Sequence, residues 1–466
     1  MGISKKDVIH FIGIGGVGMS AIARILLKLG YKVSGSDLRE SVNTIRLKDL
    51  GAKIFYKQIP SNLRSAAVVV VSTAIRADNL ELQEAYNLNL KVFRRAEMLD
   101  FLMRKYEKRI AVTGTHGKTT TSSMLACIFS GEKTAPTYLV GSDLNDYKSN
   151  AELGDGPYFI AEADESDGSF LMLDSNIGVI TNMEKEHMNY YKTEENLKVH
   201  FRKFMAKVLA NKGYLVINKD DSRLMALARD FDHQKILFYA LEGEAFVSAQ
   251  DIEAGEDGIS YNLKIEGRED IKVNLKVYGN HNVSNSLAAI AVGVREGLDV
   301  EKIISRLEKF SGTKRRMQLI GDVNKIKIFD DYAHHPTEIS TTLKGLKKSF
   351  KGRVICVFQP HRYTRTQNLF AKFVTAFEHA DKLILTEIYA ADEDRIAKVS
   401  GKLLSEEIEK QGRTMVEFVE QKGEISSRLM PQLRRGDIVI FMGAGDIYTV
   451  AKDLFLLLKK KFKISS

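Results

Sequence analysis

The fold class is decided by RIAVTGTHGKTTTSSMLACIFSG, residues 109–131. An apolar run leads into a glycine-containing turn and then into a segment with helical spacing, which predicts a strand, a phosphate-binding loop and a helix. Gly117, Lys118 and Thr119 form the second half of a Walker A loop, although Val112 stands where that loop has its first glycine. The amides, lysine and hydroxyl of such a loop bind phosphates and Mg²⁺. The stretch therefore predicts an α/β nucleotide-binding domain.

A second glycine-rich turn, GIGGVG at residues 13–18, lies near the start of the chain. It follows an apolar run, precedes a helical pattern and is followed about 20 residues later by Asp37, which matches the GxGxxG pattern of nucleotide-binding βαβ units. The amides and the dipole at the start of such a helix hold a pyrophosphate. The turn predicts a site for the diphosphate of a nucleotide and leaves open which nucleotide binds.

Acidic side chains follow two further apolar runs of the central segment. If these runs are parallel strands, the acidic groups gather at the sheet edge where open α/β sheets bind ligands, and they can bind the metal that accompanies a phosphate. The candidates in PYFIAEADESD and VITNMEKEHMNYY are Glu162, Asp164, Glu165, Asp167, Glu184, Glu186 and His187. Between Phe246 and Val277 the polar and apolar residues alternate, which predicts an antiparallel β insertion.

Two polar clusters follow strand-like runs in the last third of the chain, DDYAHH at 330–335 and HRYTR at 361–365. Arg362 and Arg365 suit an anionic group because a guanidinium binds carboxylate or phosphate at two points. Adjacent histidines are also compatible with a metal, but no third ligand has convincing zinc spacing. The clusters predict an anion-binding site at a sheet edge.

The composition of the chain indicates a folded protein and argues against a nucleic-acid-binding or membrane-spanning one. The chain has 466 residues, of which 44% are hydrophobic and 28% charged, so it is expected to be a folded, soluble protein of about three domains. Cys127 and Cys356 lie in apolar runs, which favours buried thiols and a cytoplasmic location. A net charge of +9 without a long basic run does not indicate nucleic-acid binding. No stretch is long and apolar enough for a membrane span, although the basic tail LLLKKKFKISS leaves a weak membrane-surface contact open.

The motifs together resemble the Mur ligases of peptidoglycan precursor synthesis. GIGGVGMS, GTHGKTTT, AEADESD, TNMEKEHM, NHNVSN, GTKRRMQ, DDYAHHPTE and FQPHRYTRT occur in that family's order over essentially the whole chain. The resemblance implies an α/β protein of three domains. We expect a Rossmann-like domain at 1–107 that binds a UDP-sugar, a central P-loop ATPase domain with a mostly parallel sheet at 108–313, and a C-terminal Rossmann-like domain at 314–466 that closes over ATP and the amino acid.

The resemblance also implies the reaction. In it the lactyl carboxylate of UDP-N-acetylmuramate takes the γ-phosphoryl group of ATP, and L-alanine displaces phosphate from the resulting acyl phosphate. The implied cofactors are ATP and Mg²⁺, with Mn²⁺ as a substitute, and the implied partners are the two small-molecule substrates. The implied biological process is the synthesis of peptidoglycan for the cell wall, which supports cell shape and cell division. Nucleic acid and integral membrane association are not expected, and the chain is expected to be a monomer or a weak homodimer.

Residue roles are carried over from the matching motifs. The catalytic residues are expected to be Lys118, His334, Arg362 and Arg365. ATP is expected to contact Gly114, Thr115, His116, Gly117, Lys118, Thr119, Thr120, Asn282, Arg316 and Asp331. The substrates are expected to contact Gly15, Gly16, Val17, Gly18, Asp37, Ser72, His187, Tyr332, His334, His361, Arg362 and Arg365. The metal ligands are expected to be Thr119, Glu165 and His187, of which the histidine is unusual because Mg²⁺ prefers oxygen.

One motif departs from the family pattern. Relatives usually have EPDHMD where this chain has EKEHMN at residues 184–189. His187 is retained, so metal binding is expected to persist, but Asn189 replaces a carboxylate. The group that deprotonates the alanine amine is therefore unassigned.

Three alternative functions remain at this point. A recycling ligase of the same family would attach an intact tripeptide to the same sugar nucleotide. An NAD-dependent dehydrogenase would use Gly13, Gly15, Gly18 and Asp37 but would leave GTHGKTTT without a purpose. A nucleotide-gated regulatory or scaffold protein would hydrolyse ATP slowly and would not respond to the sugar nucleotide.

Overall fold

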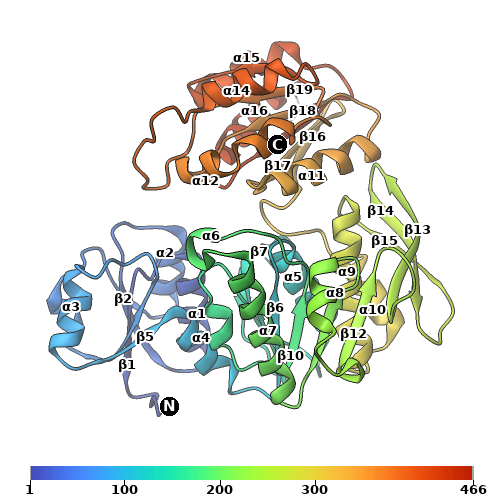
Figure 1. The fold of residues 1–466 in the computed structure, drawn as a ribbon. Coiled ribbons are helices and arrows are strands. Elements are labelled where there is room, and N and C mark those ends of the chain that lie inside the picture. Colours follow the sequence, from blue (N-terminus) through green and yellow to red (C-terminus); the bar gives the residue numbers. More distant parts are fainter. Residues whose placement is uncertain (1, 132, 148, 464–466) are drawn as a thin grey trace. The chain divides into compact units, whose positions relative to one another are not determined.

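The computed structural model describes residues 2–131, 133–147 and 149–463. These residues form two compact units (Figure 1). The first unit comprises the chain up to residue 248 together with 264–269 and 284–307, and the second comprises 249–263, 270–283 and the chain from 308 onward. The first unit contains the amino-terminal sheet and most of the central sheet, and the second contains the carboxyl-terminal sheet.

The amino-terminal sheet is parallel and has the strand order β3-β2-β1-β4-β5. Its strands are β1 (Val8–Ile12), β2 (Lys32–Ser36), β3 (Lys53–Phe55), β4 (Ala66–Val71) and β5 (Lys91–Arg94), and its helices are α1 (Val17–Lys28), α2 (Val42–Asp49), α3 (Leu80–Asn87) and α4 (Arg95–Met103). The order reverses between β1 and β4, and in open α/β sheets such a switch point is where ligands bind. The loop after β1 therefore lies at the expected ligand position.

The central sheet has ten strands in the order β15-β14-β13-β12-β11-β10-β6-β9-β7-β8. The strands are β6 (Lys108–Thr113), β7 (Thr137–Leu144), β8 (Ser149–Glu152), β9 (Tyr158–Glu162), β10 (Ile177–Ile180), β11 (Tyr214–Asn218), β12 (Ile236–Ala240), β13 (Val247–Gly255), β14 (Gly258–Ile265) and β15 (Ile271–Leu275). The helices are α5 (Lys118–Ile128), α6 (Met188–Tyr191), α7 (Glu194–Ala210), α8 (Ser222–Ala228), α9 (Asn280–Arg295) and α10 (Val300–Leu307). β6 pairs in parallel with β9 and β10, so the strands that carry the acidic motifs flank the phosphate-loop strand on either side.

The carboxyl-terminal sheet has the order β16-β17-β21-β18-β19-β20. Its strands are β16 (Gln318–Val323), β17 (Ile326–Asp331), β18 (Val354–Phe358), β19 (Lys382–Leu385), β20 (Met415–Phe418) and β21 (Ile438–Met442). Its helices are α11 (Pro336–Ser349), α12 (Tyr363–Asn368), α13 (Phe370–Thr375), α14 (Gly401–Lys410), α15 (Ile425–Leu429) and α16 (Tyr448–Lys461). β18 and β21 are buried along their whole length, as expected for inner strands covered by helices on both faces.

Short 3₁₀ helices complete the secondary structure, at Pro60–Leu63, Ser169–Met172, His233–Lys235, Lys422–Glu424 and Met430–Gln432. Both cysteines are buried, as predicted. Within the described part of the chain, no helix combines the length and the apolar character that crossing a membrane requires.

The α/β class with three mostly parallel sheets is confirmed, and so is the antiparallel insertion, because β14 pairs antiparallel with β15. Helix α4 ends at Met103, and Lys108 and Arg109 already belong to β6. Pairing with β9 fixes those two residues as strand whatever their local preference. The sequence analysis also missed β16, which pairs antiparallel with β17 at the sheet edge.

Candidate active site

The loop that the sequence predicts to bind phosphate, called the phosphate loop below, joins β6 to α5, and two glycines allow its shape. Gly114 has a φ of 129° and Gly117 a φ of 84°, which residues with a Cβ rarely adopt. Asn182 holds the loop from outside: its backbone oxygen accepts the N–H of Thr115 at 3.1 Å, and its side-chain oxygen accepts the N–H of His116 at 2.8 Å. The amides of the first turn of α5, which have no acceptor within the helix, are thereby presented at the carboxyl edge of the sheet.

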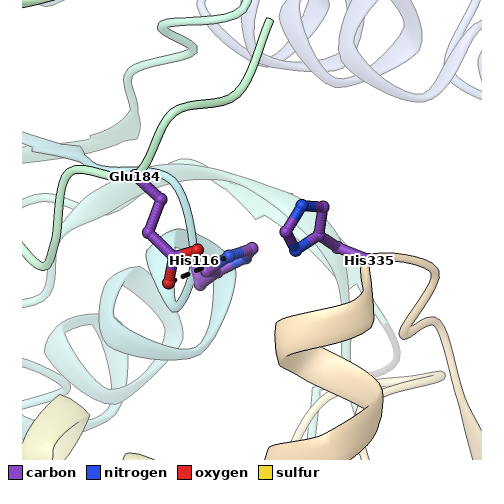
Figure 2. A group of neighbouring side chains, drawn as sticks. All are labelled: His116, Glu184 and His335. Carbon is purple, nitrogen blue, oxygen red and sulfur yellow. Dashed lines mark ion pairs between the residues drawn. The ribbon is translucent and has the colours of Figure 1, made fainter. Parts of the chain in front are cut away.

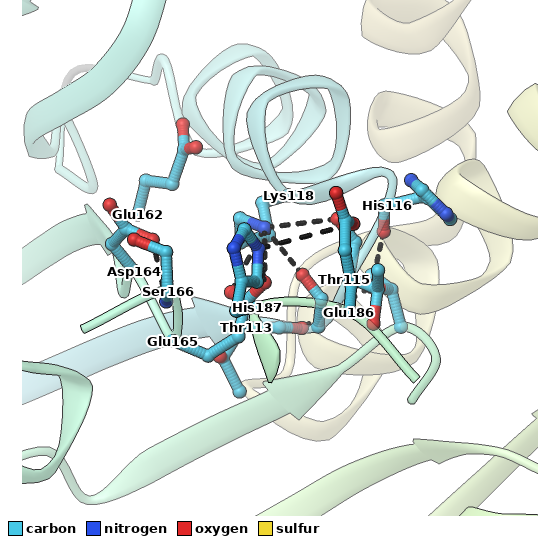
Figure 3. Close-up of polar contacts among 12 residues, drawn as sticks. Thr113, Thr115, His116, Lys118, Glu162, Asp164, Glu165, Ser166, Glu186 and His187 are labelled. Carbon is cyan, nitrogen blue, oxygen red and sulfur yellow. Dashed lines mark hydrogen bonds and ion pairs between the residues drawn. The ribbon is translucent and has the colours of Figure 1, made fainter. Parts of the chain in front are cut away.

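Lys118 is the first residue of α5 and contacts its own loop and a buried carboxylate (Figure 3). Its Nζ donates to the backbone oxygens of Gly114 at 2.6 Å and Thr115 at 3.1 Å, and to Oε1 of Glu165 at 3.1 Å. Burial lowers the pKa of Lys118, but the surrounding carboxylates, Glu165 foremost, outweigh burial and hold this pKa above its usual value. The lysine is therefore a fixed positive charge at the phosphate loop.

Thr119 and Glu162 form a second pair at the same sheet edge. The Thr119 hydroxyl donates to Oε2 of Glu162 at 2.8 Å, and the N–H of Gly141 on β7 donates to the same oxygen at 2.7 Å. A Cβ on Gly141 would lie 2.6 Å from that carboxylate oxygen and 2.9 Å from the threonine hydroxyl, so a larger residue here would require these side chains to shift. Thr120 follows in the first turn of α5 and is half-buried.

His187 approaches Glu165 from the loop after β10. Its Nε2 lies 3.5 Å from Oε1 of Glu165 and 3.9 Å from Oε2 of Glu186. Burial lowers the pKa of His187, but the bond to Glu165 and the charge of Glu186 outweigh burial and raise this pKa. The backbone of His187 has a φ of 58°, a sparsely populated region in which strain accumulates at functional sites. Asn189 is exposed on α6.

His116, at the tip of the phosphate loop, pairs with Glu184 from the loop after β10, as Figure 2 shows. Nε2 of His116 lies 3.7 Å from Oε1 of Glu184, and the N–H of Glu184 donates to the Thr115 hydroxyl at 2.8 Å. The EKEHMN segment is thus attached to the phosphate loop at its first residue and to Glu165 through its histidine.

A cavity of about 300 Å³ connects the first glycine turn to the acidic strand end. Its lining comes from the loop after β1, the first half of α1, the loop after β4, the first half of α4, strand β7 and the end of β9: Gly16, Val17, Gly18, Met19, Ala21, Ile22, Ser72, Arg95, Leu99, Leu139, Val140, Gly141, Glu162 and Asp164. Four of the predicted substrate residues, Gly16, Val17, Gly18 and Ser72, therefore share one cavity with Glu162, the carboxylate that pairs with Thr119.

Gly15 and Asp37 are not among the residues that line this cavity, and they form a hydrogen bond with each other. Oδ2 of Asp37 accepts the N–H of Gly15 at 2.8 Å, and Oδ1 accepts the N–H of Leu38 at 2.8 Å. A Cβ on Gly15 would lie 2.7 Å from Oδ2 of Asp37. The aspartate therefore fixes the shape of the glycine turn.

In the second unit, the two polar clusters meet at the ends of β17 and β18. The rings of His334 and His361 are 6.1 Å apart, and Arg365 donates to Nδ1 of His361 at 3.3 Å. Burial and the neighbouring guanidinium of Arg365 lower the pKa of His361 to about 4. Burial lowers the pKa of His334 to about 3, and its Nδ1 donates to the backbone oxygen of Tyr332 at 2.9 Å. Both imidazoles are neutral at physiological pH, next to the exposed guanidinium of Arg362.

Asp331, at the end of β17, is bonded mainly to backbone. Its carboxylate accepts the N–H of Met317 at 3.0 Å and that of Ala333 at 2.7 Å, and burial raises its pKa to about 7. Nearby, Nη1 of Arg316 lies 3.6 Å from Oε1 of Glu338 on α11. Asp331 thus lies at the carboxyl edge of this sheet, as predicted for the 330–335 cluster, and Arg316 lies near it.

Asn282 lies in the first turn of α9, where it is buried and donates to the backbone oxygen of Tyr278 at 2.8 Å. By the division of the chain it belongs to the second unit, whereas the phosphate loop belongs to the first. The predicted residues therefore form two groups, each described within its own unit.

Sequence reasoning missed Arg95 and did not single out Glu162 from its acidic run. The guanidinium of Arg95 would lie 3.3 Å from a Cβ on Gly18, and its Nη2 lies 4.0 Å from Oδ2 of Asp164. Arg95 begins a helix directly after β5, and a basic residue at the carboxyl end of a parallel strand was the signal available for it.

Comparison with family models places three Mur ligase domains along the chain. The model described as "Mur ligase family, catalytic domain" matches residues 8–107, "Mur ligase middle domain" matches 112–293, and "Mur ligase, glutamate ligase domain" matches 315–445.

Full-length relatives agree with this match. The chain is 46% identical to a UDP-N-acetylmuramate–L-alanine ligase of Pelotomaculum thermopropionicum over 99% of this chain and 100% of the relative. It is 43% identical to the protein of the same name from Desulforamulus reducens, over 98% and 99% of the two chains. Among solved structures, UDP-N-acetylmuramate-alanine ligase from Thermotoga maritima superposes with a TM-score of 0.83 at 28% identity, covering 97% of this chain and 99% of that one.

Proposed function

The chain belongs to the Mur ligase family, and we propose that it joins L-alanine to the lactyl carboxylate of UDP-N-acetylmuramate at the expense of ATP. Relatives that match over nearly the whole chain at 40–46% identity carry the name of this activity. In the proposed reaction a carboxylate oxygen attacks the γ-phosphorus and the bond to ADP breaks. The amine of alanine then attacks the acyl carbon, phosphate leaves with the bonding electrons, and the amine loses a proton.

The observation that carries the proposal is the placement of Lys118 and Glu162 within the first unit. Lys118 is a fixed cation at the phosphate loop, and Glu162 both pairs with Thr119 and lines the cavity that reaches the glycine turn. A sugar nucleotide whose diphosphate lies at Gly16–Gly18 would extend through this cavity toward the phosphate loop. This is the arrangement that transfer of a phosphoryl group from ATP to the sugar acid requires, because such catalysis depends on positioning and charge stabilisation.

The donor set at the phosphate loop fits Mg²⁺. The Thr119 hydroxyl and the Glu165 carboxylate are hard oxygen donors, and the imidazole of His187 lies against the same carboxylate. Thr119, Glu165 and His187 would hold the ion, which when bound supplies positive charge to the phosphates. Gly114–Thr120 would bind the phosphates of ATP through backbone amides, with Lys118 on the transferred group.

In the second unit, we assign the binding of carboxylates to His361, Arg362 and Arg365, with Tyr332 and His334 beside them. The neutral imidazole of His361 accepts a hydrogen bond from Arg365 through Nδ1, so its proton lies on Nε2 and can be donated to an anion. We assign Asn282, Arg316 and Asp331 to ATP. Both cysteines are buried and free, and we infer a cytoplasmic location, where thiols stay reduced.

The proposal is tested by phosphate release with the complete chain. We expect release to require ATP, Mg²⁺, UDP-N-acetylmuramate and an amino acid together, with L-alanine preferred over glycine, L-serine and the tripeptide used by recycling ligases. With ¹⁸O in the lactyl carboxylate, one labelled oxygen should appear in the released phosphate. Equal release without the sugar nucleotide or without the amino acid, or unlabelled phosphate, would refute the ligase proposal.

A further inference from the structure

The start of helix α12 has an unusual residue at its capping position. The N-cap is Arg362, whose backbone φ is 70°. An N-cap side chain normally accepts a hydrogen bond from the amides of the first turn, which is why Ser, Thr, Asp and Asn are preferred there. A guanidinium has donors and no acceptor, so Arg362 cannot serve this purpose. A non-glycine residue with left-handed backbone also needs its surroundings to hold it in place.

Glu393 supplies the missing acceptor. It lies 29 residues after Thr364, a residue of the first turn of α12. Oε2 of Glu393 accepts the N–H of Thr364 at 3.0 Å, and Oε1 accepts the Thr364 hydroxyl at 2.6 Å. Burial raises the pKa of Glu393, but the hydrogen bonds from Thr364 and the charge of Arg362 outweigh burial and hold this pKa below its usual value. Glu393 therefore caps α12 as a carboxylate with both oxygens engaged.

The loop that carries Glu393 is fixed against the segment that carries the arginines. The N–H of Tyr389 donates to the backbone oxygen of Pro360 at 2.8 Å, and the N–H of Arg362 donates to that of Tyr389 at 2.9 Å. The ring of Tyr389 stacks on His361, with centroids 5.6 Å apart and planes 9° apart. Through Tyr389, the loop is therefore attached to Arg362 and to the two residues before it.

The two residues directly before Glu393, Ala391 and Asp392, have φ values of 50° and 67°. Two consecutive non-glycine residues in this region are retained only where several contacts determine the conformation together. An apolar cluster of Tyr363, Ile388 and Val399 packs under the loop and supplies part of that support. The loop is thus built to hold Glu393 at one point.

We propose that Glu393 is a positioning residue that caps helix α12 from outside, so that the N-cap position itself is available to Arg362. Arg362 and Arg365, one turn apart on this capped start, are thereby held ready for the carboxylate of the amino-acid substrate. The inference rests on the proposed function and deepens it, because it explains how the amino-acid site is set before alanine arrives.

The first test removes only the hydrogen bond between the Thr364 hydroxyl and Glu393 and leaves the rest of the Thr364 side chain in place. Thr364→Val keeps the shape and loses the hydroxyl bond to Glu393, whereas Thr364→Ser keeps the hydroxyl. We expect Thr364→Val to raise the KM for L-alanine several-fold and Glu393→Ala to raise it roughly tenfold or more, as the loss of a charged capping acceptor implies. Thr364→Ser should match the wild type. The KM values for ATP and UDP-N-acetylmuramate should change less than about twofold.

Glu393→Gln is the conservative rescue. Its amide oxygen can still accept the Thr364 N–H, and its amide group can donate to the Thr364 hydroxyl, so its KM for L-alanine should be close to that of the wild type.

The control for simple destabilisation is Asp437→Ala. Asp437 accepts bonds from Arg353 at 2.9 and 2.6 Å before β21 begins, at the opposite edge of the sheet from His361.

The results separate two kinds of failure. A wild-type chain that releases phosphate without any amino-acid dependence refutes the proposed function, and with it this inference. A wild-type chain with normal alanine dependence refutes the inference alone if Glu393→Ala raises all three KM values equally, or if Asp437→Ala gives the same alanine effect at equal loss of Tm. If Glu393→Ala does not fold, the pair Thr364→Val and Thr364→Ser decides, and equal alanine KM values in that pair overturn the proposal.

Discussion

The phosphate-loop region of the first unit and the histidine–arginine region of the second have opposite charge. In the first, one buried lysine lies among carboxylates and its pKa is raised. In the second, neutral imidazoles lie beside guanidinium groups and their pKa values are lowered to about 3 and 4. Both regions lie at the carboxyl ends of parallel strands, where the fold alone would make them equivalent. The difference supports the proposal that the first region binds a cation and phosphates and the second binds carboxylates.

The largest effect is expected from removing the buried lysine of the acidic region. Lys118→Ala should lower kcat by about 10³-fold or more, because a preorganised charge on a transferred phosphoryl group contributes about 4 kcal/mol. Single-turnover phosphate release measures this loss, and calorimetry should find UDP-N-acetylmuramate binding nearly unchanged. Loss of sugar-nucleotide binding would contradict the separation of the phosphate loop from the glycine turn.

The next effect comes from the basic region. Arg365→Ala removes a guanidinium that bonds to His361, and we expect it to raise the KM for L-alanine by about 10²-fold, since charged hydrogen bonds contribute about 1.5 to 3 kcal/mol. Steady-state kinetics with each substrate varied in turn measures this change. An equal rise in the KM for ATP would show that the arginine is not dedicated to the amino acid.

A smaller effect is expected from the carboxylate that pairs with the loop threonine. Glu162→Gln keeps the shape but weakens the acceptor of the Thr119 hydroxyl, so kcat/KM for ATP should fall about tenfold. Glu152→Gln on β8 is the matched control, because that carboxylate forms an exposed pair with Lys28. Equal effects of the two substitutions would contradict a specific role for Glu162.

The smallest effect concerns stability and pH. His361 is neutral in the folded chain above a pKa of about 4, whereas an unfolded histidine binds a proton near pH 6.5. The folded state therefore loses stability as the pH falls from 6.5 to 4, by about 1 to 2 kcal/mol after allowance for partial exposure. His361→Asn should remove this contribution, so the Tm difference between wild type and variant should shift over this range.

Two buried carboxylates act with the opposite sign. Burial raises the pKa of Asp330 to about 6 and that of Asp331 to about 7, so the folded chain retains protons there and loses stability as the pH rises from about 4 to 7. Both groups are present in the wild type and in His361→Asn, and their contributions cancel in the comparison. A Tm difference that does not vary between pH 4 and 6.5 would contradict the assigned neutrality of His361.

Much of the architecture could be predicted because local patterns carry it. The strand–turn–helix pattern around Gly117 and the alternation between Phe246 and Val277 are readable in short windows. β16 could not be read in this way, because its polar residues and Gly321 give no clear alternation and its pairing with β17 decides its structure. Edge strands depend on the partner beside them more than on their own residues.

The site shows the same limit. Lys118, Thr119, Glu165 and His187 were named from motifs. The structure places Glu165 in contact with Lys118 and His187, and Thr119 against Glu162, although the roles of all four stay predictions. Glu393 was out of reach, because a cap supplied from 29 residues away leaves no mark next to the helix it caps. The local sequence shows only that an acceptor is missing, because an arginine stands at the N-cap position of α12.

Gly141 has a consequence for compounds aimed at the cavity it lines. A Cβ at this strand position would lie within 3 Å of both members of the Glu162–Thr119 pair, so a larger residue there would move the Glu162 carboxylate or the Thr119 hydroxyl. An inhibitor whose bulk rests against this stretch of backbone would lie where any new side chain also displaces one of these two groups. Resistance through Gly141 would therefore also alter the Glu162–Thr119 pair, which makes its neighbourhood a favourable anchor for drug design.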